Sequence, residues 1–127
     1  MPASHETVDK KLHYIRMTGN SVFKVAVKTM ADTLDELLKE KNIDPSQISL
    51  LIPHQANERI IFSVAERLKF PKEKIFLNIA KYANTSAATI PIALTEALEE
   101  NRIKKGDFVA LVAFGGGFTW GSMIIKW

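Results

Sequence analysis

Residues 48–55 read Ile-Ser-Leu-Leu-Ile-Pro-His-Gln, a short apolar run closed by a proline and followed directly by a histidine. An apolar run of this length is consistent with a strand that is buried on both faces of a sheet. Pro53 has no backbone N–H and ends the strand, which places His54 in the turn that follows. Because ligands gather at the carboxyl ends of strands in open α/β sheets, His54 occupies a position typical of a functional site.

Amphipathic helices are predicted before and after this strand. From Gly19 to the Asp44-Pro45 pair, apolar residues recur at three-and-four spacing and charged residues take the other face, with Asn20 or Ser21 as the N-cap. A second helix is predicted over residues 60–68, and a third follows Asn84, where Pro91 near the first turn is expected to tilt or kink it. The sequence therefore places helical segments between successive strands.

Further strands are predicted over residues 13–17, 75–79, 108–114 and 118–127. Strands that alternate with helices predict an α/β fold with a mostly parallel sheet and helices on both of its faces. The last two strands, joined through glycines, predict an antiparallel C-terminal pair. We expect one domain over residues 13–127, preceded by a polar lead-in over residues 1–12.

The composition indicates a globular protein and excludes several classes. With 127 residues, 46% hydrophobic and 24% charged, the chain has the size and composition of one domain with a buried core. It contains no apolar run of transmembrane length and no basic segment followed by an apolar one at its start, so we expect a cytoplasmic protein without a membrane partner. The net charge of +3 comes from interspersed charges, which disfavours nucleic acid as a partner.

The sequence contains no cysteine. This excludes a disulfide framework, a thiolate zinc site and a cysteine nucleophile supplied by this polypeptide. We expect neither a metal site nor a bound cofactor.

His54 and Asn84 each have two interpretations. His54 either satisfies backbone groups at a strand end or faces a substrate. Asn84 follows a predicted strand and precedes a helix, where asparagine usually serves as a cap or a turn residue. If the two strand ends lie side by side, an imidazole N–H and an amide N–H can both donate to one carbonyl oxygen and stabilise the negative charge that develops there, as an enolate-forming step requires.

The glycine run and the first turn of the second helix are further candidates. Gly115, Gly116 and Gly117 lie between two predicted strands where a shorter turn would suffice. They form either a bulged hairpin or a close backbone approach to a substrate, with an N–H as an oxyanion donor. Arg59 is either a solvated arginine or, if a pocket forms near His54, a group that binds phosphate or carboxylate.

Taken together, three stretches resemble the C-terminal signatures of β-ketoacyl-[acyl-carrier-protein] synthase III. They are Pro53-His54-Gln55-Ala56-Asn57, Asn84-Thr85-Ser86-Ala87-Ala88, and the segment of residues 113–121, Ala-Phe-Gly-Gly-Gly-Phe-Thr-Trp-Gly. Order and spacing match as well, and the resemblance covers residues 14–127. It implies the C-terminal half of a thiolase-like fold, which in this family consists of two similar α/β halves packed together.

The resemblance implies a catalytic role for four residues. In the family, a cysteine of the first half takes a short acyl group from coenzyme A, and malonyl-acyl carrier protein then decarboxylates and attacks that thioester. His54 and Asn84 match the pair that binds the malonyl thioester carbonyl. The Gly116 N–H would complete an oxyanion hole for the acyl-cysteine, and Phe114 would shield the nucleophile from water and favour loss of the carboxylate.

Other positions match the substrate path. Gly19, Phe23, Asn57 and Asn84 correspond to residues that line the pantetheine tunnel, and Lys24 and Arg59 to basic residues at its mouth, where acyl carrier protein docks. The expected partners are this carrier protein, acyl-CoA, the missing N-terminal half with its cysteine and, in the full enzyme, a second copy as a homodimer. The isolated chain is expected to be inactive.

Two alternatives stand beside this acyltransferase. In the first, the chain is a non-catalytic module that binds carrier protein or coenzyme A. In the second, it is half of a related condensing enzyme with a Cys-His-Asn set. Asn84 favours synthase III over the elongating synthases I and II, which place a second histidine there.

Overall fold

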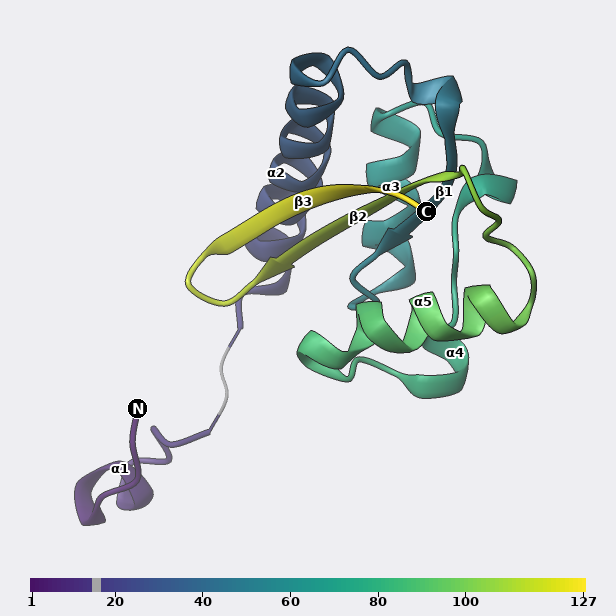
Figure 1. Cartoon of the computed structure of the whole chain (residues 1–127). Helices are drawn as coiled ribbons and strands as arrows, with labels where there is room; N and C mark the ends of the chain where they lie inside the picture. Colours follow the sequence, from purple (N-terminus) through teal and green to yellow (C-terminus); the bar gives the residue numbers. More distant parts are fainter. Residues whose placement is uncertain (15–16) are drawn as a thin grey trace.

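The computed structural model describes residues 1–14 and 17–127 and contains a mixed sheet in the order β1-β2-β3 (Figure 1). Strand β1 (Ile48–Pro53) pairs in parallel with β2 (Phe108–Gly115), which pairs in antiparallel with β3 (Thr119–Lys126). The α/β class and the antiparallel C-terminal pair are confirmed. The sheet is mixed rather than mostly parallel, because a predicted fourth strand does not form.

Helices cover both faces of the sheet, as predicted. Helices α2 (Gly19–Glu40) and α3 (Glu58–Arg67) pack on one face, where Leu34, Leu51 and Ile61 belong to one buried cluster. Helix α5 (Thr89–Glu99) packs on the other face, in a second cluster with Ile52 and Ala97. Figure 1 shows α2 and α3 side by side, apart from α5. The sheet is thus the middle layer of three, which is why β1 is apolar on both of its faces.

The start of α2 differs from the prediction. Its N-cap is Thr18, whose side chain makes no capping hydrogen bond, while Asn20 and Ser21 lie inside the first turn. The N–H of Ser21 donates to the Thr18 carbonyl at 3.1 Å, so the helical hydrogen bonds begin two or three residues earlier than the expected caps. The helix ends as expected before Asn42, which has a left-handed φ of 53°.

The predicted strand over residues 75–79 is wrong. Ile75 makes a single parallel bridge to Leu51, and Ile79 already begins helix α4 (Ile79–Tyr82). In this ladder the Phe76 N–H donates to the Leu51 carbonyl at 2.9 Å, and the next rung needs the N–H of residue 53. That residue is Pro53, so the ladder stops.

The buried side chain of Gln55 replaces the missing rungs. Its Nε2 donates to the carbonyls of Pro53 at 2.8 Å and of Phe76 at 3.2 Å, and its Oε1 accepts from the Asn78 N–H at 3.1 Å. Every backbone group released by the proline therefore finds a partner, which a buried segment requires.

The N-terminal segment contains a short helix, α1 (His5–Asp9), with a capping box between Ser4 and Thr7. Figure 1 shows it lying away from the sheet. The strand predicted over residues 13–17 is wrong for its described part: His13 and Tyr14 lie in a turn and a bend, and Met17 has no regular structure. Residues 15 and 16 lie outside the described residues. The remaining short helices are η1 (Pro45–Gln47), η2 (Lys72–Lys74) and η3 (Ser86–Ala88).

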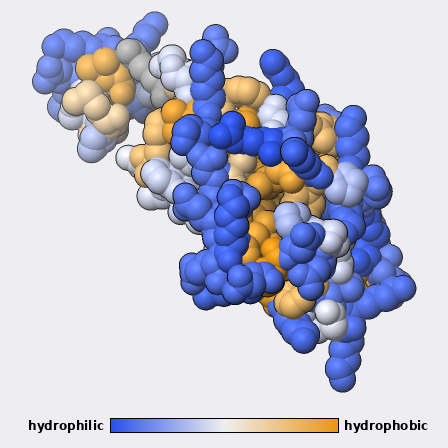
Figure 2. Space-filling view, turned by 90° about the horizontal axis from the view of Figure 1, so that it is seen from above, coloured by the Kyte–Doolittle hydropathy of each residue, from blue (hydrophilic) through white to orange (hydrophobic). Residues whose placement is uncertain are grey.

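Much apolar surface stays exposed. In the view from above, hydrophobic surface lies open between charged side chains (Figure 2). Several large apolar side chains of the β2–β3 hairpin and the C-terminus are 41–56% exposed, namely Phe118, Trp120, Met123 and Trp127. None of the described helices combines the length and the apolar composition that crossing a bilayer requires.

Candidate active site

His54 follows β1 and is held against the end of β2. Its backbone N–H donates to the Val112 carbonyl at 2.8 Å, one step beyond the pairing of Pro53 with Val112. The half-buried imidazole therefore lies at the carboxyl edge of the parallel strand pair, where Phe114 and the glycine run also follow. This is the edge at which α/β sheets bind ligands.

The ring of His54 contacts a hydroxyl group rather than backbone groups. Its Nδ1 lies 2.5 Å from Oγ1 of Thr89, the first residue of α5, and Thr89 is only 2% exposed. Burial lowers the pKa of His54, so the imidazole is neutral at neutral pH. A neutral ring has one N–H donor and one lone pair, and its partner at Nδ1 decides which nitrogen carries the proton.

Asn84 forms a turn, as the simpler interpretation predicted. Its Oδ1 accepts from the Ser86 N–H at 2.9 Å, and only the amide oxygen can accept there, so the NH₂ group is the donor left for a ligand. Asn84 follows α4 rather than a strand, because the preceding segment does not pair beyond Ile75.

One turn connects Asn84 to His54. The Ser86 N–H donates to Asn84, the Thr89 hydroxyl donates to the Ser86 carbonyl at 3.0 Å, and this hydroxyl contacts the His54 ring. Both predicted catalytic side chains thus contact residues 84–89, the stretch that leads from α4 into α5.

Within the glycine run, Gly117 is the residue whose backbone conformation requires a glycine. Its φ is +149°, and a Cβ there would lie 2.9 Å from Cγ2 of Thr119, whereas a Cβ on Gly116 would meet nothing within 4 Å. Residues 116–118 form the hairpin loop between β2 and β3, which agrees with the hairpin interpretation, and Gly116 is exposed. Phe114 is half-buried, and the centroid of its ring lies 5.1 Å from the centroid of the Phe118 ring.

The helix starts bring the expected tunnel and docking residues together. The Arg59 guanidinium lies 5.7 Å from the centroid of the Phe23 ring, so the first turn of α3 lies beside the second turn of α2. Asn57 is the N-cap of α3, and its side chain accepts from the Arg59 N–H at 2.9 Å. Gly19 begins α2, and Lys24 is exposed one residue beyond Phe23.

Sequence reasoning missed two residues of this region. Gln55 was seen only as part of a motif, although it bridges the segment after Pro53 to residues 76–78. Thr89 was not considered, although a hydroxyl in the otherwise apolar first turn of a helix is a signal for a local polar contact.

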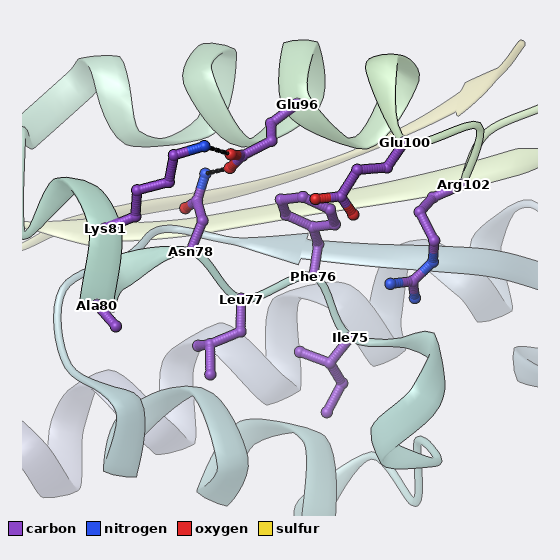
Figure 3. A pocket seen from close by; sticks show the side chains of 9 residues that line it. All are labelled: Ile75, Phe76, Leu77, Asn78, Ala80, Lys81, Glu96, Glu100 and Arg102. Carbon is purple, nitrogen blue, oxygen red and sulfur yellow. Dashed lines mark hydrogen bonds and ion pairs between the residues drawn. The ribbon is translucent and has the colours of Figure 1, made fainter.

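A pocket of about 400 Å³ lies elsewhere, beneath α5. Figure 3 shows Lys81 and Asn78 pointing at Glu96, while Glu100 and Arg102 lie at the other end of the pocket. Lys81 and then Asn78 hydrogen-bond the Glu96 carboxylate and lower its pKa. None of the predicted site residues lines this pocket, and we assign it no role in catalysis.

The comparisons with known proteins agree with the three sequence signatures. Residues 38–127 match the family model of the 3-oxoacyl-[acyl-carrier-protein (ACP)] synthase III C terminal. Over 126 residues, 99% of the chain, it is 57% identical to β-ketoacyl-[acyl-carrier-protein] synthase III of Natranaerobius thermophilus, and over its whole length it is 54% identical to that of Caldanaerobacter subterraneus. The chain covers 38% of each of these relatives.

Solved structures of this class have the same fold. The synthase III of Aquifex aeolicus matches 90% of the chain with a TM-score of 0.88 and 53% identity, and the chain covers 37% of it. That of Pseudomonas aeruginosa matches the whole chain with a TM-score of 0.90 and 38% identity, and the chain covers 38% of it.

The fold places the chain in the thiolase-like class of α/β proteins. The chain belongs to the family of the C-terminal domain of 3-oxoacyl-[acyl-carrier-protein] synthase III.

Proposed function

We propose that the chain is the C-terminal catalytic half of a 3-oxoacyl-[acyl-carrier-protein] synthase III, which works together with an N-terminal half that supplies a nucleophilic cysteine. The observation that carries this proposal is the link between His54 and Asn84 through the turn of residues 84–89. The chain has no cysteine and spans 38% of its relatives' length, so we expect no condensation by the chain alone.

The proposed reaction is a decarboxylative Claisen condensation. Malonyl-acyl carrier protein loses carbon dioxide, and the electron pair of the broken C–C bond forms an enolate whose oxygen accepts from the imidazole of His54 and the Asn84 NH₂ group. The enolate carbon then attacks the acyl-cysteine thioester carbonyl, and the cysteine leaves as a thiolate. Each donor lowers the barrier by roughly 3 kcal/mol, the usual effect of an oxyanion donor.

The residues that follow β2 would serve the acyl-cysteine. The Gly116 N–H would donate to the oxyanion formed when the thioester is attacked, and the open space around Gly116 is compatible with close approach of a substrate. The half-buried Phe114 would exclude water from the cysteine and disfavour the malonyl carboxylate.

The helix starts would form the substrate path. Gly19, Phe23 and Asn57, with Asn84, would line a tunnel for the pantetheine arm. Lys24 and Arg59, both exposed, would bind an acidic carrier protein and the phosphates of acyl-CoA. The pair of Arg59 and Phe23 supports this, since it places the docking charge beside a tunnel wall.

Other features of the proposal concern the complete protein. It would act in the cytoplasm in fatty acid biosynthesis, as a homodimer, and without a metal or a cofactor besides its thioester substrates. The open apolar surface of the hairpin would be covered by the N-terminal half.

Complementation tests the proposal. The chain is mixed with the N-terminal part of a related synthase III, and carbon dioxide release and 3-oxoacyl product are measured from acetyl-CoA and malonyl-acyl carrier protein. We expect activity only in the mixture and its loss with His54→Ala. A folded complex, verified by light scattering, that stays inactive with the unmodified chain would instead favour a module that only binds the carrier protein.

A further inference from the structure

Helix α4 contains a single turn, which is too short to be stable by itself. It ends at Ala83, whose φ of 56° is a conformation that residues with a side chain rarely adopt and that persists only when the surroundings hold it. Asn84 follows Ala83 directly. The place of the Asn84 side chain therefore depends on what holds α4.

One buried carboxylate holds α4 at both of its ends. Oε2 of Glu96, a residue that is 8% exposed, accepts at 2.8 Å from Nδ2 of Asn78, the N-cap of α4. Oε1 accepts from Nζ of Lys81 and, at 3.3 Å, from the hydroxyl of Tyr82. Figure 3 shows the side chains of Asn78 and Lys81 directed at this carboxylate. Helix α4 is thus fixed to α5 at its start and at its end.

Helix α5 also contacts His54. Thr89 begins this helix, and its buried hydroxyl lies 2.5 Å from Nδ1 of His54. Glu96 follows Thr89 by seven residues, about two helical turns, so these two buried side chains lie on the same face of α5. His54 therefore contacts the start of α5, and the segment that leads to Asn84 is held two turns further along.

We propose that Glu96 is a positioning residue: its carboxylate holds α4 on α5 and thereby sets where the NH₂ group of Asn84 lies relative to the His54 ring. Two donors serve one oxygen only if both lie within hydrogen-bonding distance of it, so their separation matters for catalysis. This role belongs to the carboxylate, and the adjacent pocket needs no ligand for it. The effect on catalysis rests on the proposed function, whereas the position of Asn84 does not.

The position of Asn84 is measured in the ¹⁵N-labelled full chain. ¹H–¹⁵N correlation spectra show the side-chain NH₂ group of Asn84, and Asn84→Asp assigns its signals. Glu96→Leu removes the acceptor from both ends of α4, so the Asn84 signals should shift and broaden. Unchanged Asn84 signals in a folded Glu96→Leu chain would overturn the inference.

The conservative variant Glu96→Gln should retain the Asn84 signals of the unmodified chain. A glutamine can serve both partners, because its oxygen accepts from Lys81 and its NH₂ group donates to the side-chain oxygen of Asn78 once that amide has turned over. Glu99→Leu is the matched control, since Glu99 is exposed on the same helix, and it should leave the Asn84 signals unchanged.

A second variant serves if Glu96→Leu does not fold. Lys81→Met combined with Tyr82→Phe removes the two hydrogen bonds at the end of α4. The side chain of Lys81 is 63% exposed and Tyr82 is 36% exposed, so this variant should fold. The Asn84 signals should shift in it as well; if they do not, the inference is wrong.

Activity of the complemented enzyme tests the effect on catalysis. Glu96→Leu should lower kcat for malonyl decarboxylation about ten- to a hundredfold, the effect of a misplaced group, and should change KM for malonyl-acyl carrier protein much less. Glu96→Gln should restore most of the rate. Leu38→Ala controls for lost stability, because Leu38 is buried in the cluster of α2 and α3 on the other face of the sheet, and kcat of its folded form should not change.

A double variant separates this inference from the proposed function. If Glu96 acts through Asn84, Glu96→Leu should lower kcat no further in a chain that already carries Asn84→Asp, because changes along one chain of contacts are not additive. Independent, multiplying losses would contradict the inference alone. Shifted Asn84 signals with full activity of both single variants would contradict the catalytic role of Asn84 and leave its positioning by Glu96 intact.

Discussion

The guanidinium of Arg59 lies 5.7 Å from the centroid of the Phe23 ring, so the first turn of α3 lies beside the second turn of α2. An exposed cation–π pair of this kind contributes about 0.5–1 kcal/mol, which is too little to dominate folding. Its consequence is geometric, because it sets a cation at a fixed place beside residues expected to line a tunnel.

Replacing Arg59 should therefore affect binding more than stability. In the complemented enzyme we expect Arg59→Ala to raise the Kd for acyl carrier protein at least about fivefold at low salt, with a smaller effect at high salt, where screening weakens surface charges. Lys72→Ala is the matched control, since Lys72 lies 5.4 Å from the Phe62 ring elsewhere on the molecule. Equal effects of both substitutions would contradict a specific docking role.

Asn84→Asp separates the turn from the proposed donor. The carboxylate retains an oxygen for the Ser86 N–H but removes the NH₂ group, so folding should be preserved and decarboxylation should fall about a hundredfold or more. Circular dichroism checks the fold and carbon dioxide release the rate. Full activity of Asn84→Asp would show that Asn84 serves only the turn.

Gln55→Leu should destabilise the chain. The change leaves the Phe76 carbonyl and the Asn78 N–H buried without their side-chain partner, at a cost of about 1–3 kcal/mol each before relaxation. Urea unfolding should show a lower midpoint with an unchanged slope. Gln47→Leu is the control, because it removes only an exposed capping bond from the Asp44 N–H at 2.8 Å and should lower the midpoint less; similar midpoints for both variants would argue against the bridging role of Gln55.

The hairpin loop predicts a contrast between two neighbouring glycines. Gly117→Ala places a Cβ 2.9 Å from Thr119 in a backbone conformation that side chains rarely adopt, so we expect a loss of about 1–3 kcal/mol. Gly116→Ala meets open space and should change the free energy of unfolding by less than about 0.5 kcal/mol. If Gly116→Ala nonetheless abolishes condensation, the backbone there contacts substrate.

The lowered pKa of His54 predicts a pH dependence of stability. Burial favours the neutral ring in the folded state, so below the ordinary value of 6.5 the unfolded chain takes up the proton first. The contribution of the neutral His54 ring to the free energy of unfolding is complete above pH 6.5. It is lost as the pH falls from there toward the folded-state pKa of His54, and the free energy of unfolding changes no further on this account at lower pH. Chemical unfolding at several pH values should show this loss in the unmodified chain and less of it in His54→Gln; parallel curves would refute it.

The sequence by itself determined the class of the fold and pointed to a candidate site. Apolar periodicity is a local property, so α2, α3, α5 and the strands β1 to β3 were predicted close to their observed bounds. The three signatures pointed to His54, Asn84 and the glycine run, and to the family that the comparisons confirm. The roles of these residues stay predictions.

Only the tertiary structure decided which groups meet. Residues 75–79 have the composition of a strand, but strand pairing beyond Ile75 needs a backbone N–H at position 53, which is a proline in a different segment. The side chain of Gln55 donates to the Phe76 carbonyl in place of that N–H. Thr89 looks like one more residue of an amphipathic helix until α5 packs against the end of β1 and brings its hydroxyl to His54. Hydrogen bonds between distant segments depend on packing, which leaves no periodic trace in the sequence.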